Sequence, residues 1–233
     1  MDNEEEKQDE QEQPNTENLT PIGVITPEKS KHKVFCLNII GHVEGHALLS
    51  PQQKTTKYEH VIPQLTLVEE DDTIEGLLVT LNTVGGDVEA GLAIAEMIST
   101  MGKPTVSLII GGGHSIGVPL ATSSNYSFIA QSATMTLHPI RMTGLVIGAS
   151  QTYEYFDKVQ QQVMRFIERN SKIKYAELKK LMNATGQISN DVGTILFGHE
   201  AVEKGIIDSV GGIREAFDKL YEMIEKKKKR RKK

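Results

Sequence analysis

The chain has 233 residues, which is enough for one domain with a complete hydrophobic core but too few for two large domains. Its net charge of −5 is unevenly distributed, because residues 1–20 carry eight acidic side chains and one lysine whereas residues 226–233 are all lysine or arginine. The part between these segments is therefore net negative, and this argues against a nucleic-acid partner.

The cysteine content and hydropathy indicate a cellular compartment. The single cysteine, Cys36, lies in an apolar run and is expected to be a small buried side chain rather than a disulfide partner or a metal ligand. The acidic first residues lack the basic and then apolar pattern of a secretory signal, and no window reaches the roughly 18 to 20 apolar residues that span a bilayer. We therefore expect a cytoplasmic protein.

The two charged ends flank one predicted domain. Residues 1–32 are an acidic segment, residues 33–225 the domain, and residues 226–233 a polybasic tail. Since runs of like charge repel one another and bury nothing, we expect both ends to be solvated and disordered. The alternative for the basic tail is a contact with an anionic membrane surface.

The first predicted elements of the domain are strands. Short apolar runs that end in turn residues predict buried parallel strands at residues 34–40 and 74–82, with a partly helical and otherwise unassigned segment between them. Asp87 is expected to cap the helix that follows. The apolar residues of this helix recur at helical spacing: Val88, Leu92, Ala95 and Ile98.

The remaining pattern alternates between strands and helices. Strands are predicted at residues 105–110, 126–130, 134–137 and 206–210, and helices at residues 115–124, 150–168, 174–183, 199–205 and 213–225. This alternation predicts an α/β fold in which helices pack on a mostly parallel sheet.

A glycine-rich turn carries a candidate nucleophile. Gly113-His114-Ser115-Ile116-Gly117 has the Gly-x-Ser-x-Gly spelling of a serine on a sharp strand-to-helix turn, although five residues alone are weak evidence. The α/β-hydrolase order of serine, acid and histidine would require His199, but too little chain follows it. His138 is the better candidate base, because it ends a predicted strand that can return to the same edge of the sheet as Ser115.

A second glycine turn, Gly85-Gly86, joins a predicted strand to a helix. Backbone N–H groups at such a turn are free to donate, and a serine hydrolase needs two donors aimed at its tetrahedral oxyanion. Gly86 N–H and Ile116 N–H are the candidates. A glycine pair by itself is also typical of a tight turn or a phosphate cradle.

Four segments in the same order resemble the ClpP serine peptidases, and among them the translocation-enhancing subgroup. They are LNTVGGDVEAGLAIAEMI, VSLIIGGGHSIGVPLATSSNYSFIAQSATMTLHPIR, LMNATGQ and EAVEKGIIDSV. The resemblance implies a crotonase-like spiral of ββα units in a single domain. It also implies Ser115 as nucleophile, His138 as general base and then acid, and Gly86 and Ile116 as oxyanion donors. We expect no cofactor and no metal.

The same resemblance implies partners. Residues 150–168 would form the handle through which rings of identical subunits stack, and the substrates would be polypeptides. The acidic N-terminal segment is unlike the axial segment of ordinary ClpP, so docking of an ATP-driven unfoldase is left open.

The third triad member departs from the pattern of the family. The aspartate position of the family falls on Gly193, and Asp191, two residues away, is the candidate carboxylate. Its role would be to hold the tautomer of His138. The alternative is that Asp191 is a solvated loop residue.

Other readings of the sequence predict different chemistry. His42, Glu44 and His46 superficially suggest a metal site, but they lack the His-Glu-x-x-His zinc spelling.

The leading hypothesis is a cytosolic, self-compartmentalising serine peptidase. A catalytically inactive scaffold that binds secretory precursors or membrane components is the second hypothesis, and acyl-CoA chemistry on the same spiral is the third.

Overall fold

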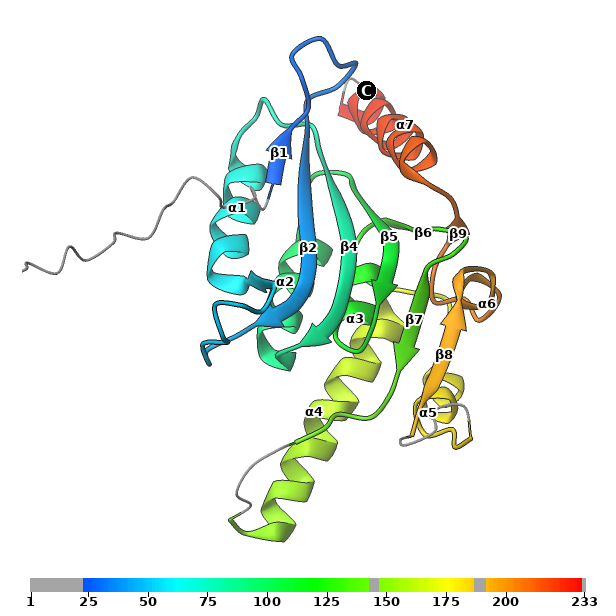
Figure 1. Ribbon diagram of the computed structural model, residues 1–233. Coiled ribbons are helices and arrows are strands. Elements are labelled where there is room, and N and C mark those ends of the chain that lie inside the picture. Colours follow the sequence, from blue (N-terminus) through cyan, green and yellow to red (C-terminus); the bar gives the residue numbers. More distant parts are fainter. Residues whose placement is uncertain (1–22, 143–146, 187–191, 232–233) are drawn as a thin grey trace, which may run out of the picture.

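The computed structural model describes residues 23–142, 147–186 and 192–231, which fold around one twisted sheet (Figure 1). Strands β1, β2, β4, β5, β6 and β9 lie in that order, β3 pairs with β2, and β7 joins β5 to β8. The pairs β1/β2 and β7/β8 are antiparallel and the others are parallel. The strands are β1 (Gly23–Ile25), β2 (Val34–Glu44), β3 (Thr55–Lys57), β4 (Gly76–Gly86), β5 (Thr105–Gly113), β6 (Tyr126–Ile129), β7 (Thr134–Leu137), β8 (Thr194–Phe197) and β9 (Ser209–Val210).

Helices cover both faces of the sheet. They are α1 (Tyr58–Glu70), α2 (Val88–Thr100), α3 (Gly117–Thr122), α4 (Ala149–Arg169), α5 (Tyr175–Met182), α6 (Gly198–Glu203) and α7 (Ile213–Arg231). Because side chains alternate along a strand, Leu77 and Val79 of β4 enter the larger core with α1 and α2, whereas Leu78 packs with α7. The α/β fold class predicted from the sequence is confirmed.

The start of α2 fixes the path of the chain at the second glycine turn. The Asp87 Oδ1 atom accepts a hydrogen bond from Ala90 N–H at 2.8 Å, as predicted for an N-cap. The helix therefore begins directly after Gly86 and carries the chain away from the end of β4.

Helix α4 projects from the body of the molecule (Figure 1). Its buried residues, Val163, Met164, Phe166 and Ile167, all lie towards its C-terminal end. Tyr153, near its N-terminal end, is 74% exposed. The helix predicted at residues 150–168 is confirmed.

Three short strands and one helix end differ from the sequence prediction. Strands β1, β3 and β8 were not predicted, because each has only three or four residues and depends on pairing with a longer neighbour. Helix α7 does not end at residue 225 but continues to Arg231, with Lys228 Nζ 2.6 Å from Glu75 Oε1. Lysine and arginine are good helix formers, and positive charge is favourable at a helix C-terminus.

Within the described ranges no helix is both long and apolar enough to cross a bilayer.

Candidate active site

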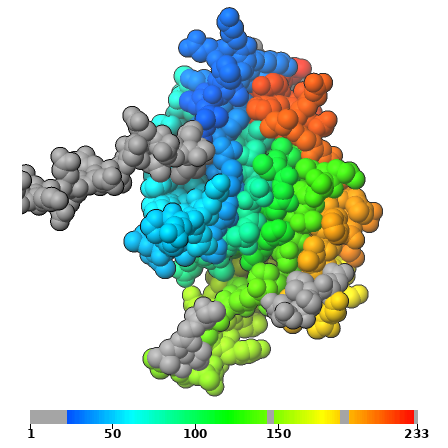
Figure 2. All heavy atoms as spheres, in the orientation of Figure 1, coloured from blue at the N-terminus to red at the C-terminus, as the bar shows by residue number. Residues whose placement is uncertain are grey.

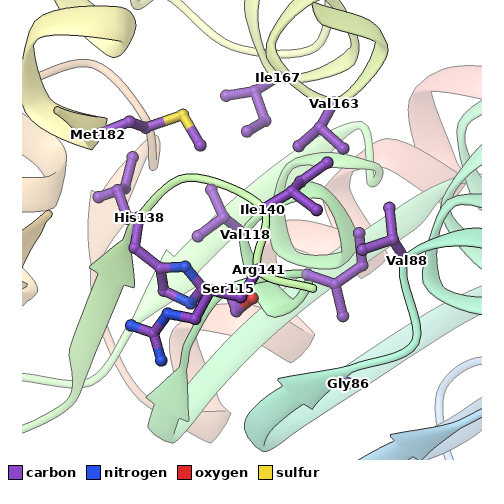
Figure 3. Close-up of a pocket in the computed structure, with 12 residues that line it drawn as sticks. Gly86, Val88, Ser115, Val118, His138, Ile140, Arg141, Val163, Ile167 and Met182 are labelled. Atoms are coloured by element: carbon purple, nitrogen blue, oxygen red, sulfur yellow. The ribbon is translucent and has the colours of Figure 1, made fainter. Parts of the chain in front are cut away.

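A cavity of about 120 Å³ lies at the carboxyl ends of β4, β5 and β7 (Figure 3). Ser115, His138, Gly86 and Ile116, which the sequence analysis singled out, all line it. The rest of its wall is apolar apart from Arg141: Val88, Val118, Leu137, Ile140, Val163, Ile167 and Met182. Segments far apart in the sequence therefore bring four predicted site residues to one place.

Ser115 has an unusual backbone conformation. Its φ of 57° makes it the one non-glycine residue with a positive φ in the part of the chain that the structure describes. Such a conformation costs on the order of 1 to 3 kcal/mol and persists only where neighbouring bonds enforce it. Ser115 N–H donates to the Thr136 carbonyl at 2.9 Å, and Gly117 N–H donates to the His114 carbonyl at 2.8 Å. The turn is thus tied to β7 and leads directly into α3.

Glycine at position 85 lets β4 pass close to this turn. Gly85 has a φ of +94°, and a Cβ atom there would lie 2.6 Å from the Ser115 Cβ. That separation is too short for two carbon atoms in contact, so a larger residue would displace the serine.

His138 approaches the same cavity from the end of β7. Its Nδ1 atom is 2.6 Å from the carbonyl oxygen of its neighbour Pro139. Figure 3 shows the ring on the same side of the cavity as the Ser115 side chain. No hydrogen bond joins these two side chains within the described residues. The structure therefore places the predicted nucleophile and base on one cavity without a bond between them.

Thr136 is a site residue that the sequence analysis missed. Its carbonyl accepts from Ser115 N–H, and its Oγ1 atom is 2.9 Å from His114 Nδ1. Burial lowers the pKa of His114, and the nearby charge of His138 lowers it further. The sequence carried one signal for Thr136. Side chains alternate between the two faces of a strand, so Thr136 and His138 share one face of the β7 segment.

The two predicted oxyanion donors have different surroundings. In the parallel pairing of Val43 with Gly86, Asp87 N–H donates to the Val43 carbonyl at 2.9 Å, so the N–H of Gly86 faces away from β2. A Cβ atom on Gly86 would lie 2.2 Å from the Val43 carbonyl oxygen, so only glycine fits. Among the described residues, Ile116 N–H at the start of α3 has no hydrogen-bond acceptor.

The candidate acid, Asp191, lies outside the described residues. Gly193 is described, and it lies against the backbone of Leu137 and His138. His199 is exposed on α6 and does not line the cavity, which removes the basis for the α/β-hydrolase alternative.

The groups considered for an alternative metal site have other contacts. Glu44 is buried, with Lys57 Nζ 3.8 Å away, and a hydrogen bond from Thr55 lowers its pKa. His46 Nδ1 lies 3.2 Å from the hydroxyl of Tyr58.

A serine on a strand-to-helix turn, a histidine on the neighbouring strand end and two glycine-turn residues with candidate amide donors, Gly86 and Ile116, line one cavity and define a candidate serine-hydrolase site on an α/β sheet. The family model for Clp protease matches residues 32–214, and the chain belongs to this family.

Curated relatives agree with this assignment. The chain is 58% identical over 200 residues to "Translocation-enhancing protein TepA" of Halalkalibacterium halodurans, an alignment that covers 86% of this chain and 78% of the relative. It is 26% identical over 157 residues to "ATP-dependent Clp protease proteolytic subunit" of Streptococcus pneumoniae, which covers 64% of this chain and 76% of the relative.

Proposed function

We propose that the chain is a cytosolic serine peptidase that hydrolyses peptide bonds of unfolded or small proteins through an acyl-enzyme. The observation that carries the proposal is the joint placement of Ser115, His138, Gly86 and Ile116 around one cavity. The unusual φ of Ser115 supports it further, because strained backbone clusters at functional sites.

Each residue has a role that follows from its chemistry. His138 takes the hydroxyl proton of Ser115 as Oγ attacks the carbonyl carbon of the peptide, and the negative charge moves to the carbonyl oxygen. The N–H groups of Gly86 and Ile116 donate to that oxygen. His138 then gives the proton to the departing amine, and a water molecule activated by the same imidazole releases the acyl group. The steps use only protein groups and water.

The cavity wall supports a preference for apolar substrates. Val163 and Ile167 from α4 and Met182 from α5 face the space beside Ser115 (Figure 3). A charged side chain packed against these three residues would lose its hydration and find no partner among them; of the described residues, Arg141 is the one charged side chain that lines the cavity besides His138. The residue that precedes the scissile bond is therefore proposed to be apolar.

The test replaces the nucleophile. Ser115→Ala should lower the turnover of a fluorogenic peptide with leucine before the scissile bond on the order of a million-fold, and His138→Ala should be comparably severe. Labelling by a fluorophosphonate probe should disappear in Ser115→Ala and persist in Ser99→Ala, whose serine lies on α2 away from the cavity. Peptidase activity that survives Ser115→Ala would disprove the assignment.

A second candidate function is an inactive scaffold that binds secretory precursors or membrane components. It is favoured by the absence of a Ser115–His138 hydrogen bond among the described residues and by glycine at the position of the family's acid. The name of the TepA relative supports a link to protein translocation. A parent protein that neither hydrolyses peptides nor reacts with the probe would favour the scaffold.

We also propose that the protein assembles into stacked rings of identical subunits through α4. The support is that the N-terminal half of this helix contributes nothing to the core.

The polybasic end of the chain is proposed to bind an anionic membrane surface reversibly. No unfoldase partner and no nucleic acid enter these proposals.

A further inference from the structure

We propose that the carbonyl oxygen of Pro139, rather than a carboxylate, orients His138, and that Gly193 is a positioning residue that maintains this arrangement. The inference deepens the proposed peptidase function and rests on it. Under this proposal the catalytic side chains are those of Ser115 and His138, without a third, acidic one.

The hydrogen bond of His138 determines which ring nitrogen carries the proton. A carbonyl oxygen only accepts, so the 2.6 Å contact between His138 Nδ1 and the Pro139 carbonyl requires a proton on Nδ1. In the neutral ring, Nε2 then has a free lone pair, and this is the form that can take a proton from Ser115. In triad enzymes a buried aspartate selects the same tautomer.

The local backbone makes Pro139 suited to this role. A residue that precedes proline is held in extended conformations, and His138 directly follows β7. The proline ring also fixes the φ of residue 139. The acceptor is therefore part of a stiff backbone and lies next to the ring that it orients.

Gly193 closes the space behind His138. It has a φ of +141°, and a Cβ atom there would lie 2.4 Å from the Leu137 carbonyl oxygen and 2.9 Å from the His138 Cβ. Its N–H donates to the Ala184 carbonyl at 2.8 Å, which holds it in place. The position that the family resemblance gives to the acid thus has no room for any side chain.

The test compares three single variants of the full-length protein. Asp191→Asn should retain kcat within about tenfold of the parent, whereas loss of a triad aspartate costs about ten thousand-fold. Gly193→Ala should lower kcat about a hundredfold at unchanged KM, because a misplacement of about 1 Å has that effect. The matched control is Gly186→Ala, since Gly186 also has a positive φ, +103°, but a Cβ atom there would meet nothing within 4 Å. Its kcat should equal that of the parent.

A spectroscopic measurement separates orientation from general damage. Nitrogen-15 NMR of histidine-labelled protein reports the tautomer of His138, whose signal is assigned by its loss in His138→Gln. We expect a protonated Nδ1 in the parent and in Asp191→Asn, and averaging of the two tautomers in Gly193→Ala.

Each outcome decides part of the proposal. A loss of a thousandfold or more in Asp191→Asn, or averaged tautomers in that variant, would overturn it. Equal kcat in Gly193→Ala and Gly186→Ala would remove the role of Gly193. If Gly193→Ala does not fold, the kcat and the His138 tautomer of Asp191→Asn still decide between the Pro139 carbonyl and a carboxylate. An inactive parent with a fixed Nδ1 proton would refute the proposed peptidase function but leave the orientation of His138 intact.

Discussion

Ser115 combines a reactive hydroxyl with a backbone conformation that serine does not favour. Its φ of 57° is enforced from both sides, by the hydrogen bond to Thr136 and by the close approach of Gly85. This turn places Ser115 in the lining of the cavity, which His138 and Ile116 also line. At Ser115, the backbone conformation that the proposed function uses therefore lowers the stability of the folded protein.

This conflict gives a prediction about stability. Ser115→Gly should be more stable than Ser115→Ala by roughly 0.5 to 1 kcal/mol, because glycine removes the cost of the left-handed conformation, about 1 to 2 kcal/mol, but adds freedom to the unfolded chain. Both variants should be inactive. Urea unfolding of the two proteins at one pH measures the difference.

The comparison is controlled by its design, because both variants remove the same hydroxyl. An alanine variant as stable as the glycine variant would mean that the backbone at residue 115 carries no strain in the folded protein.

At the scale of elements, α4 has two parts with different surroundings. Its C-terminal part supplies Val163 and Ile167 to the cavity wall, whereas Tyr153 and Tyr155 near its N-terminus are 74% and 51% exposed. Figure 1 shows this part of the helix extending beyond the sheet. One helix thus joins the candidate active site to the surface proposed for assembly.

The proposed assembly predicts that Tyr153→Ser weakens association. A tyrosine at the centre of an interface commonly contributes about 2 kcal/mol or more, so the dissociation constant should rise at least tenfold. Sedimentation velocity over a range of concentrations measures this shift. Glu154→Gln, which changes the exposed neighbour on the same helix, should leave the mass distribution unchanged. A parent that sediments as a monomer would end the proposal.

At the scale of the whole molecule, the candidate active site and the basic end of the chain lie at opposite ends of the strands of the sheet. The cavity is at the carboxyl ends of the strands, whereas Lys228 contacts Glu75 and Lys227 contacts the Gly102 carbonyl, just before β4 and β5 respectively. Figure 2 shows α7 (orange to red) on the upper part of one face, with α4 at the lower end. A membrane contact through α7 would therefore leave the cavity accessible.

The membrane proposal predicts a loss of binding when exposed charges of α7 are removed. Lys226, Lys229 and Arg230 are exposed, and each basic residue near an anionic surface contributes about 1 kcal/mol. Replacing all three by glutamine should weaken co-sedimentation with anionic vesicles about a hundredfold. Added salt should weaken binding of the parent, because the attraction decays over a Debye length of about 8 Å.

A matched variant controls for net charge. Lys158, Lys179 and Lys180 are exposed on α4 and α5, away from α7, and their replacement by glutamine removes the same charge. This variant should bind as the parent does. Equal sedimentation of all three proteins, or equal binding to neutral vesicles, would contradict the proposal.

Much of the fold was predictable because its long elements carry strong patterns. The strands β2, β4 and β5 and the helices α2 and α4 were located from apolar runs and helical periodicity. Strand β8 could not be located, because its four residues are stabilised by pairing with β7 and not by their own composition. The helical end of α7 was missed for a related reason, since its contact with Glu75 comes from a distant part of the chain.

The sequence by itself determined the candidate nucleophile, the candidate base and the family. Gly-x-Ser-x-Gly, a glycine pair before a helix and a histidine at a strand end are local patterns with a fixed order. Only the tertiary structure decided that Ser115 takes a left-handed conformation, that Thr136 binds both the serine turn and His114, and that Gly193 packs on His138. The physical reason is that these features are close contacts between segments far apart in the sequence. Local composition encodes strands, helices and turns, but the distance between two segments depends on how the whole sheet packs.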